Sequence, residues 1–100
     1  MATPDRKLPR GRMGGESIDK ALRQAGTNRH LVVMEYASAS GETKTYKLAP
    51  YSYRDGGAKL FAFDTLAGCI KGFKTSEIIR IEETAESFEP QWPVELEVAS

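Results

Sequence analysis

Basic and aromatic side chains are interleaved along one stretch in the middle of the chain, from Thr45 to Phe73. Aromatic rings stack on nucleobases, and lysine and arginine pair with phosphates. A surface that carries both kinds of side chain suits an anionic ligand, such as a nucleotide or a single-stranded nucleic acid. The residues of this stretch, or directly after it, that we expect to bind such a ligand are Tyr51, Tyr53, Arg54, Lys71 and Lys74.

The same pattern also has a purely structural interpretation. Phe61 and Phe63 alternate along one predicted strand, and Lys71 and Phe73 along the next. A small β domain needs its phenylalanines as core, and lysine and arginine are exposed in most proteins. The pattern alone leaves both interpretations open.

Residues for catalysis or metal binding are scarce in the sequence. The chain has one histidine, His30, and one cysteine, Cys69, which is too few for a metal site of the usual kind. Nucleophilic catalysis needs a nucleophile beside a base, and phosphate-binding loops need spaced glycines, and neither pattern is present. We therefore expect a protein that is not an enzyme and that uses no cofactor and no metal.

The chain of 100 residues has a formal net charge of zero, but its charges are segregated. Residues 1–15 carry a net charge of +3, residues 16–81 carry +3, and residues 82–100 carry −6. The local field, rather than the total, decides long-range attraction to an anion. No apolar run is long enough to span a bilayer, and no secretory signal is visible, so we expect a cytoplasmic protein without membrane association.

A single helix is predicted near the start of the chain. Ile18, Ala21, Leu22 and Ala25 recur with helical spacing, so the helix should run from Ser17 to Ala25. We expect Ser17 to cap its beginning and Gly26 to end it. Residues 1–15, rich in glycine, proline and basic residues, are predicted to be a disordered segment.

Short strands separated by turn residues follow the helix. Pro50 should lie at a strand end, an edge or a bend. So many short strands must hide their edges, which favours a mainly β fold with one N-terminal helix: a small Sm-like β-barrel of about five antiparallel strands. The barrel and helix would occupy residues 16–83, and residues 84–100 would form an acidic extended tail. The predicted strands are Leu31–Tyr36, Thr43–Leu48, Lys59–Asp64, Cys69–Lys74 and Ile78–Glu82.

The chain resembles the WYL domain, an Sm-like sensor module common in bacterial transcription regulators. The segments that carry the resemblance are, in order, VVMEY, PYSYR, LFAFD, IKGF, IIRIEET and SFEPQWP. The tripeptide that names the family falls on Ala58, Lys59 and Leu60, of which only the leucine matches. Glu77 stands where the family usually has a basic residue.

The resemblance implies a ligand site formed by basic and aromatic residues, with Tyr53, Arg54, Lys71 and Lys74 as the matching positions. A helix-turn-helix is absent from the sequence, and one short helix does not bind DNA in that way. The resemblance therefore implies a free-standing sensor or accessory module for transcription regulation, which would act through a partner.

A second function remains open from the sequence. Small β-barrels pair through open strand edges, either with a second copy or with another protein. The acidic tail, with Phe88, Trp92 and Val94, would bind such a partner or fold back across the barrel. An anion-binding module and a protein-interaction domain are thus the two functions we carry forward.

Overall fold

The computed structural model describes residues 13–96, so the expectation of disorder for residues 1–15 lies mostly outside the described residues. One helix precedes five strands, and two short 3-10 turns, η2 (Asp55–Gly57) and η3 (Thr75–Glu77), separate some of them. The helix is α1 (Gly15–Asn28), and the strands are β1 (His30–Ala37), β2 (Thr43–Arg54), β3 (Lys59–Asp64), β4 (Cys69–Lys74) and β5 (Ile78–Ser87).

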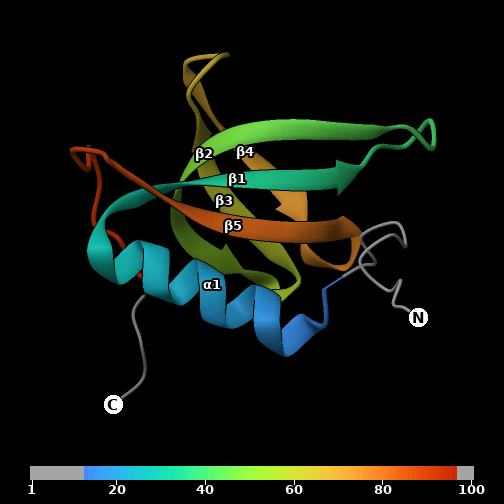
Figure 1. Ribbon diagram of the computed structural model, residues 1–100, viewed down its shortest axis with the longest axis horizontal. Helices are drawn as coiled ribbons and strands as arrows, with labels where there is room; N and C mark the ends of the chain where they lie inside the picture. Colours follow the sequence, from blue (N-terminus) through green and yellow to red (C-terminus); the bar gives the residue numbers. More distant parts are fainter. Residues whose placement is uncertain (1–12, 97–100) are drawn as a thin grey trace, which may run out of the picture.

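The five strands form one antiparallel sheet in the order β4-β3-β2-β1-β5. The sheet is strongly bent, and α1 lies across one of its faces, where it packs on β5, β1 and β2 (Figure 1). The face that α1 covers is called the inner face, and the opposite one is called the outer face. The mainly β class with one N-terminal helix and five antiparallel strands is as predicted.

The expected closed barrel is not present, because β4 and β5 are the edges of the sheet and do not pair with each other. Backbone polar groups at or near these two edges form hydrogen bonds with groups from outside the strand ladder. The backbone N–H of Met13 donates to the carbonyl of Ile79 at 2.8 Å, on the free side of β5. The backbone N–H of Lys74 donates to the hydroxyl of Tyr36 at 3.0 Å, which links β4 to β1. These contacts reduce the need for closure.

The core lies between the inner face and α1. Leu22 of the helix is fully buried, as are Met34, Leu48 and Leu60 of the sheet. The helix is too short to be stable alone, so its stability comes from this burial. Replacing a leucine in such a position with alanine typically costs about 2–5 kcal/mol.

The helix is longer than predicted at both ends. Its N-cap is Gly14 instead of Ser17, and its C-cap is Arg29, which adopts a left-handed conformation with φ 58° and ψ 46°. Gly26 was expected to end the helix, but it lies buried within it. The physical reason is a close approach, because a Cβ built on Gly26 would lie 2.3 Å from the carbonyl oxygen of Leu96.

Three strands also run beyond their predicted ends, β1 by a single residue at each end. Strand β2 continues through Pro50 to Arg54, and a bulge between Pro50 and Ser52 provides the bend that the proline predicted. Because β2 lies between β1 and β3, this proline is in a central strand, where a bulge is the usual way to accommodate it. Strand β5 continues past Glu82 to Ser87.

The segment after β5 folds back on the domain. The backbone N–H of Phe88 donates to the carbonyl of Arg29 at 2.9 Å, and that of Glu95 donates to the carbonyl of Tyr51 at 2.7 Å. Val94 and Leu96 are buried in the core. Residues 88–96, called the C-terminal segment below, are therefore anchored both at the end of α1 and along β2.

The approach of Leu96 to Gly26 gives a test of this anchoring. Replacing a glycine within a helix by alanine normally raises the free energy of unfolding by up to about 1 kcal/mol. We expect Gly26→Ala to do the reverse and lower the free energy of unfolding by about 2 kcal/mol or more, because the backbone of Leu96 must move away. The matched control is Gly15→Ala, where a Cβ meets nothing within 4 Å. Urea denaturation of both variants measures these free energies of unfolding. If Gly26→Ala stabilised the protein as much as Gly15→Ala, the close packing of Gly26 on Leu96 would be contradicted.

Candidate functional site

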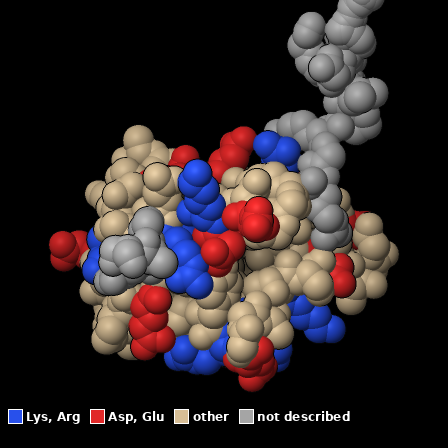
Figure 2. Space-filling view, turned by 90° about the horizontal axis from the view of Figure 1, so that it is seen from below, with Lys and Arg blue, Asp and Glu red and all other residues tan. Residues whose placement is uncertain are grey.

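On the side that carries α1, lysine and arginine are interspersed with aspartate and glutamate (Figure 2). A surface of mixed charge has no net field to attract an anion. On the outer face of the sheet, the strand register brings three cations together at one corner, across β2, β3 and β4. The part of that face formed by β1 and β5 carries both signs, with Glu35 opposite Arg80.

Cross-strand register arranges the outer face in rows. Arg54 pairs with Lys59, and Lys59 pairs with Lys74, so three exposed cations form one row across β2, β3 and β4. This set is called the basic row. The row beside it contains Ser52, Phe61 and Gly72. Like charges directly opposite each other destabilise a sheet, and a bound anion would relieve that cost.

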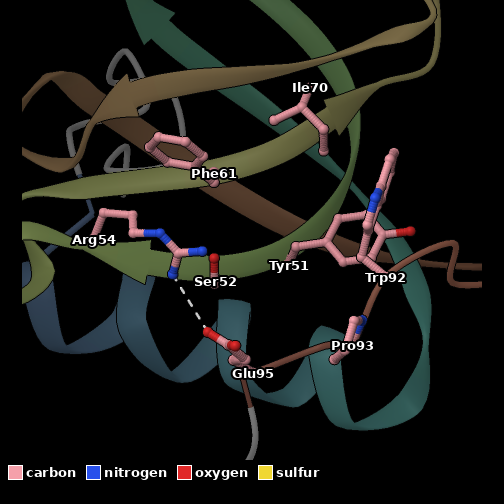
Figure 3. Close-up of a pocket in the computed structure, with 8 residues that line it drawn as sticks. All are labelled: Tyr51, Ser52, Arg54, Phe61, Ile70, Trp92, Pro93 and Glu95. Atoms are coloured by element: carbon pink, nitrogen blue, oxygen red, sulfur yellow. Dashed lines mark hydrogen bonds and ion pairs between the residues drawn. The ribbon is translucent and has the colours of Figure 1, made fainter.

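A groove lies next to the basic row, between the outer face and the C-terminal segment (Figure 3). Its volume is about 290 Å³, close to the lower end of the range for small-molecule sites. We call it the outer-face groove. Its lining residues are Tyr51, Ser52, Arg54, Phe61, Ile70, Trp92, Pro93 and Glu95.

Tyr51 builds one end of the groove from the β2 bulge. Its ring contacts Phe88 and Trp92 edge-on, with centroid distances of 5.7 and 5.4 Å. Its hydroxyl accepts a hydrogen bond from the backbone N–H of Gln91 at 2.9 Å. Tyr51 is itself buried, so its role is to hold Trp92 in place, while Trp92 is 46% exposed and free to contact a ligand.

Arg54 stands where the groove meets the basic row. Its guanidinium lies 5.4 Å from the centre of the Phe61 ring, and its Nη1 donates to the carbonyl of Tyr53 and to Oε1 of Glu95. The side chains of the Arg54–Glu95 pair are 50% and 60% exposed, so the pair is weak and open to exchange with a ligand. Nε and Nη2 make no hydrogen bond within residues 13–96.

The floor of the groove holds a polar group without a partner. Ser52 is 4% exposed, and its hydroxyl makes no hydrogen bond to any residue that the structure describes. Buried polar groups are nearly always hydrogen-bonded in native proteins. A hydroxyl that lines the groove and has no partner among the described residues is available to a ligand.

The five residues predicted for the site do not share one face. Tyr51 and Arg54 line the outer-face groove, and Lys74 belongs to the basic row. Tyr53 and Lys71 pair with Leu60 and Ala62, two buried residues of the inner face. The residues of the site that sequence reasoning missed are Ser52, Lys59, Phe61, Trp92 and Glu95.

Tyr53 takes part in a contact between the sheet and α1. Its hydroxyl donates to Oδ1 of Asp19 at 2.7 Å, and the guanidinium of Arg23 lies 5.5 Å from its ring centre. Burial raises the pKa of Tyr53 above its usual range, and the hydrogen bond to Asp19 adds to that effect. A phenol held in this way fixes the helix on the sheet.

Lys71 and Asp64 form an ion pair on the inner face, with Nζ and Oδ2 3.1 Å apart. Oδ1 of Asp64 accepts the backbone N–H groups of Leu66 and Ala67, which closes the turn between β3 and β4. Burial alone would raise the pKa of Asp64, but the hydrogen bonds from Lys71, Ala67 and Leu66 outweigh it and lower that pKa below 3.8. Lys71 also lies over the ring of Tyr46.

A second hollow lies near the position where the WYL resemblance implies a basic pocket. Its volume is about 320 Å³, and both Lys74 and Glu77 line it together with Tyr36. Glu77 thus places a carboxylate in the same hollow as the lysine. This pairing of opposite charges makes the hollow less attractive to an anion than the outer-face groove.

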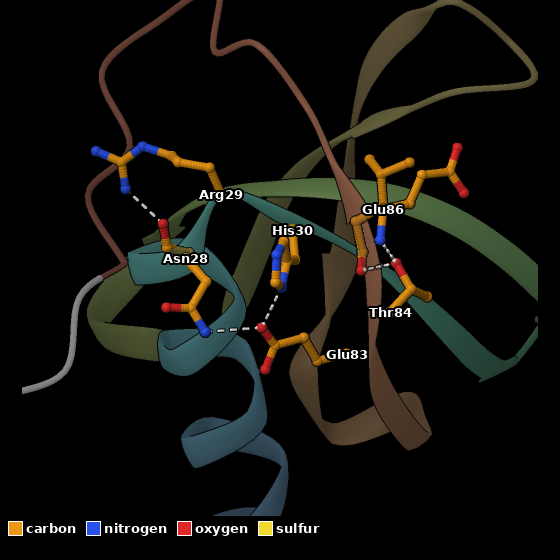
Figure 4. Close-up of polar contacts among 8 residues, drawn as sticks. Asn28, Arg29, His30, Glu83, Thr84 and Glu86 are labelled. Atoms are coloured by element: carbon orange, nitrogen blue, oxygen red, sulfur yellow. Dashed lines mark hydrogen bonds and ion pairs between the residues drawn. The ribbon is translucent and has the colours of Figure 1, made fainter.

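His30 has a structural partner (Figure 4). Its Nδ1 lies 2.7 Å from Oε2 of Glu83, which also accepts a hydrogen bond from Asn28 at 2.9 Å. These contacts join the end of α1 and the start of β1 to β5. Within the described ranges, no three side chains that could hold a metal ion are grouped together, and no helix is long and apolar enough to cross a membrane.

The likeness of this chain to known proteins is found among solved structures. No protein-family model and no curated protein matches the chain. Among solved structures, the chain is similar to proteasome accessory factor B/C (PafBC) of Arthrobacter aurescens, with a TM-score of 0.69 and 20% identity over 84% of this chain. The chain spans about 15% of the length of that protein. The likeness is one of fold, and it supports a WYL-like fold for this domain.

The Asp64–Lys71 pair predicts a pH dependence of stability. Because the pKa of Asp64 is lowered in the folded state, its charge stabilises the fold above about pH 4, and this contribution is lost as the pH falls through the folded-state value. We expect Asp64→Asn to unfold more easily than wild type at pH 7. The difference should shrink in acid, below about pH 4. Thermal melts of both proteins between pH 7 and pH 2 would show this, and a difference that stays constant would argue against the ion pair.

Proposed function

We propose that this domain is a WYL-like regulatory module that binds an anionic ligand with an aromatic base, either a nucleotide or a single-stranded nucleic acid, in the outer-face groove. The observation that carries the proposal is the position of the basic row directly beside a groove that is lined by the exposed ring of Trp92 and the half-buried ring of Phe61. Such a combination recognises both chemical parts of a nucleotide.

The aromatic part of the groove suits the base. The rings of Phe61 and Trp92 both line the space above Ser52 (Figure 3). Stacking of a base on one aromatic ring is worth about 1–3 kcal/mol. The unpartnered hydroxyl of Ser52 offers the base a hydrogen bond at the floor of the groove.

The basic row suits the phosphates. Lys59 and Lys74 are exposed and form no ion pair within the described part of the chain, and Arg54 keeps two nitrogen atoms available. Charge-assisted hydrogen bonds from these groups to phosphate oxygens are stronger than neutral ones. The row therefore supplies affinity, and the groove supplies selectivity for a base.

The regulatory part of the proposal rests on the WYL resemblance and on the likeness of fold to PafBC. We infer that the module senses its ligand in a transcription-related setting and passes the signal to a partner. It contains no paired nucleophile and base among the described residues, so we expect it to bind a nucleotide without converting it.

The proposal is tested by a fluorescence titration. Trp92 is the single tryptophan of the chain, so its emission reports on the groove alone. We expect single-stranded oligonucleotides to quench Trp92, with an affinity that falls steeply as salt rises. Arg54→Ala combined with Lys59→Ala should weaken binding at least about tenfold, because two phosphate contacts are lost.

The matched control removes two exposed lysines elsewhere, Lys20→Ala with Lys44→Ala, so that the net charge changes equally. The control should bind within about twofold of wild type, because it loses only long-range attraction to the anion and no direct contact. Equal weakening by both double variants would show non-specific attraction only. Absence of quenching at low salt would overturn the proposal.

The open edge at β4 supports the second function that we carry forward. Strand β4 pairs only with β3 among the described strands, and Leu66 at the turn between them is 88% exposed. An unpaired edge beside an exposed apolar side chain is a place where another strand can add. Sedimentation velocity over a range of concentrations tests self-association, and a monomer throughout would leave only a different protein as the partner.

A further inference from the structure

Glu95 is held rigidly at the groove although its side chain is exposed. Its backbone N–H donates to the carbonyl of Tyr51 at 2.7 Å, and its neighbours Val94 and Leu96 are both buried. Leu96 in turn packs directly on Gly26. The main chain at residue 95 is thus fixed from both sides, and only the side-chain torsions of the glutamate are free.

Arg54 orients the carboxylate of Glu95. Nη1 of Arg54 contacts Oε1 of Glu95 at 3.3 Å, whereas Oε2 makes no hydrogen bond within the described residues. Figure 3 shows the carboxylate at the edge of the groove, near Ser52 and below the space between Phe61 and Trp92. A base that stacks in this space would bring its polar edge to Ser52 and Glu95.

We propose that Glu95 is a specificity-determining residue that selects guanine among the bases, an inference that rests on the proposed function. A carboxylate only accepts hydrogen bonds, so it pairs best with two adjacent donors. Guanine presents N1–H and the 2-amino group side by side. Adenine and cytosine each present one amino group next to an acceptor nitrogen, and uracil presents one N–H between two carbonyls.

The other groups of the site agree with this assignment. The hydroxyl of Ser52 is a donor for O6 of guanine, next to the N1–H that Glu95 would accept. Nη1 of Arg54 keeps Glu95 in place, while its other two nitrogen atoms and the lysines of the basic row, Lys59 and Lys74, are available to the phosphate. A bidentate contact to one base typically discriminates against the others by about tenfold or more.

The experiment compares nucleoside monophosphates of equal charge by quenching of Trp92. We expect GMP to bind about tenfold more tightly than AMP, CMP or UMP. Inosine monophosphate keeps N1–H and O6 but lacks the 2-amino group, so it should bind distinctly more weakly than GMP. Glu95→Gln should remove the preference for GMP, because the NH2 group of glutamine replaces one acceptor oxygen and then faces a donor of guanine. The same variant should leave the affinity for UMP within about threefold of wild type.

The control variant is Glu89→Gln, which removes one exposed charge from the same C-terminal segment outside the groove lining. It should keep the preference for GMP. If Glu95 acted only by repelling anions, Glu95→Gln would raise the affinity for every nucleotide equally, which would overturn the inference. Circular dichroism confirms that the variants fold.

Two further outcomes separate this inference from the proposed function. Equal binding of all four standard nucleotides would overturn base selection by Glu95 and leave the binding module intact. If GMP and inosine monophosphate bind equally well, a preference for both over the other nucleotides comes from contacts to O6 and N7, which arginine typically makes. That result would also overturn the role of Glu95. If neither nucleotides nor oligonucleotides quench Trp92, both proposals are wrong.

Discussion

The outer-face groove depends on Tyr51. This residue lies in the bulge of β2 and binds the C-terminal segment through its carbonyl, its hydroxyl and its ring, which contact Glu95, Gln91 and Trp92 in turn. Without the bulge, the strict alternation of a strand would give its side chain a different direction. Pro50 directly before it removes one ladder hydrogen bond and favours the irregularity. The bulge in this central strand thus forms one wall of the outer-face groove.

Much of the fold follows from sequence pattern, because the period of apolar residues determines which face of an element is buried. Strands β3 and β4 have their predicted bounds, and Leu60 and Ala62 share one face as their alternation predicts. That face is the buried one, whereas Phe61 and Phe63, which the structural interpretation placed in the core, are half-buried on the opposite face. The end of α1 was missed because Gly26 has two explanations, a helix end or a close contact, and only the distant Leu96 distinguishes them. A barrel was expected where the structure has an open sheet, since strand number and length do not say which edges pair.

The candidate site was predictable only in part. The mixture of aromatic and basic residues indicated the ligand class, but it did not say which side chains share a face. Lys59 could have been found with Arg54 and Lys74, because hairpin register places residues opposite each other once the Asp55–Gly57 turn is located. The sequence left open whether the tail with Trp92 folds back or binds a partner, and it did not place Trp92 or Glu95 in the groove, because both reach it through a segment without regular structure.

The pairing of β1 with β5 has a consequence for the order in which the site forms. His30 lies opposite Ser87, so the contact spans more than half of the chain, and the C-terminal segment can dock only after this pairing. Long-range strand pairing of this kind is slow relative to local hairpins. During synthesis, β2, β3 and β4 leave the ribosome before Trp92 and Glu95, and we expect this three-stranded meander to form first. The cations of the basic row are therefore assembled first, and the groove beside them is the last part of the domain to mature.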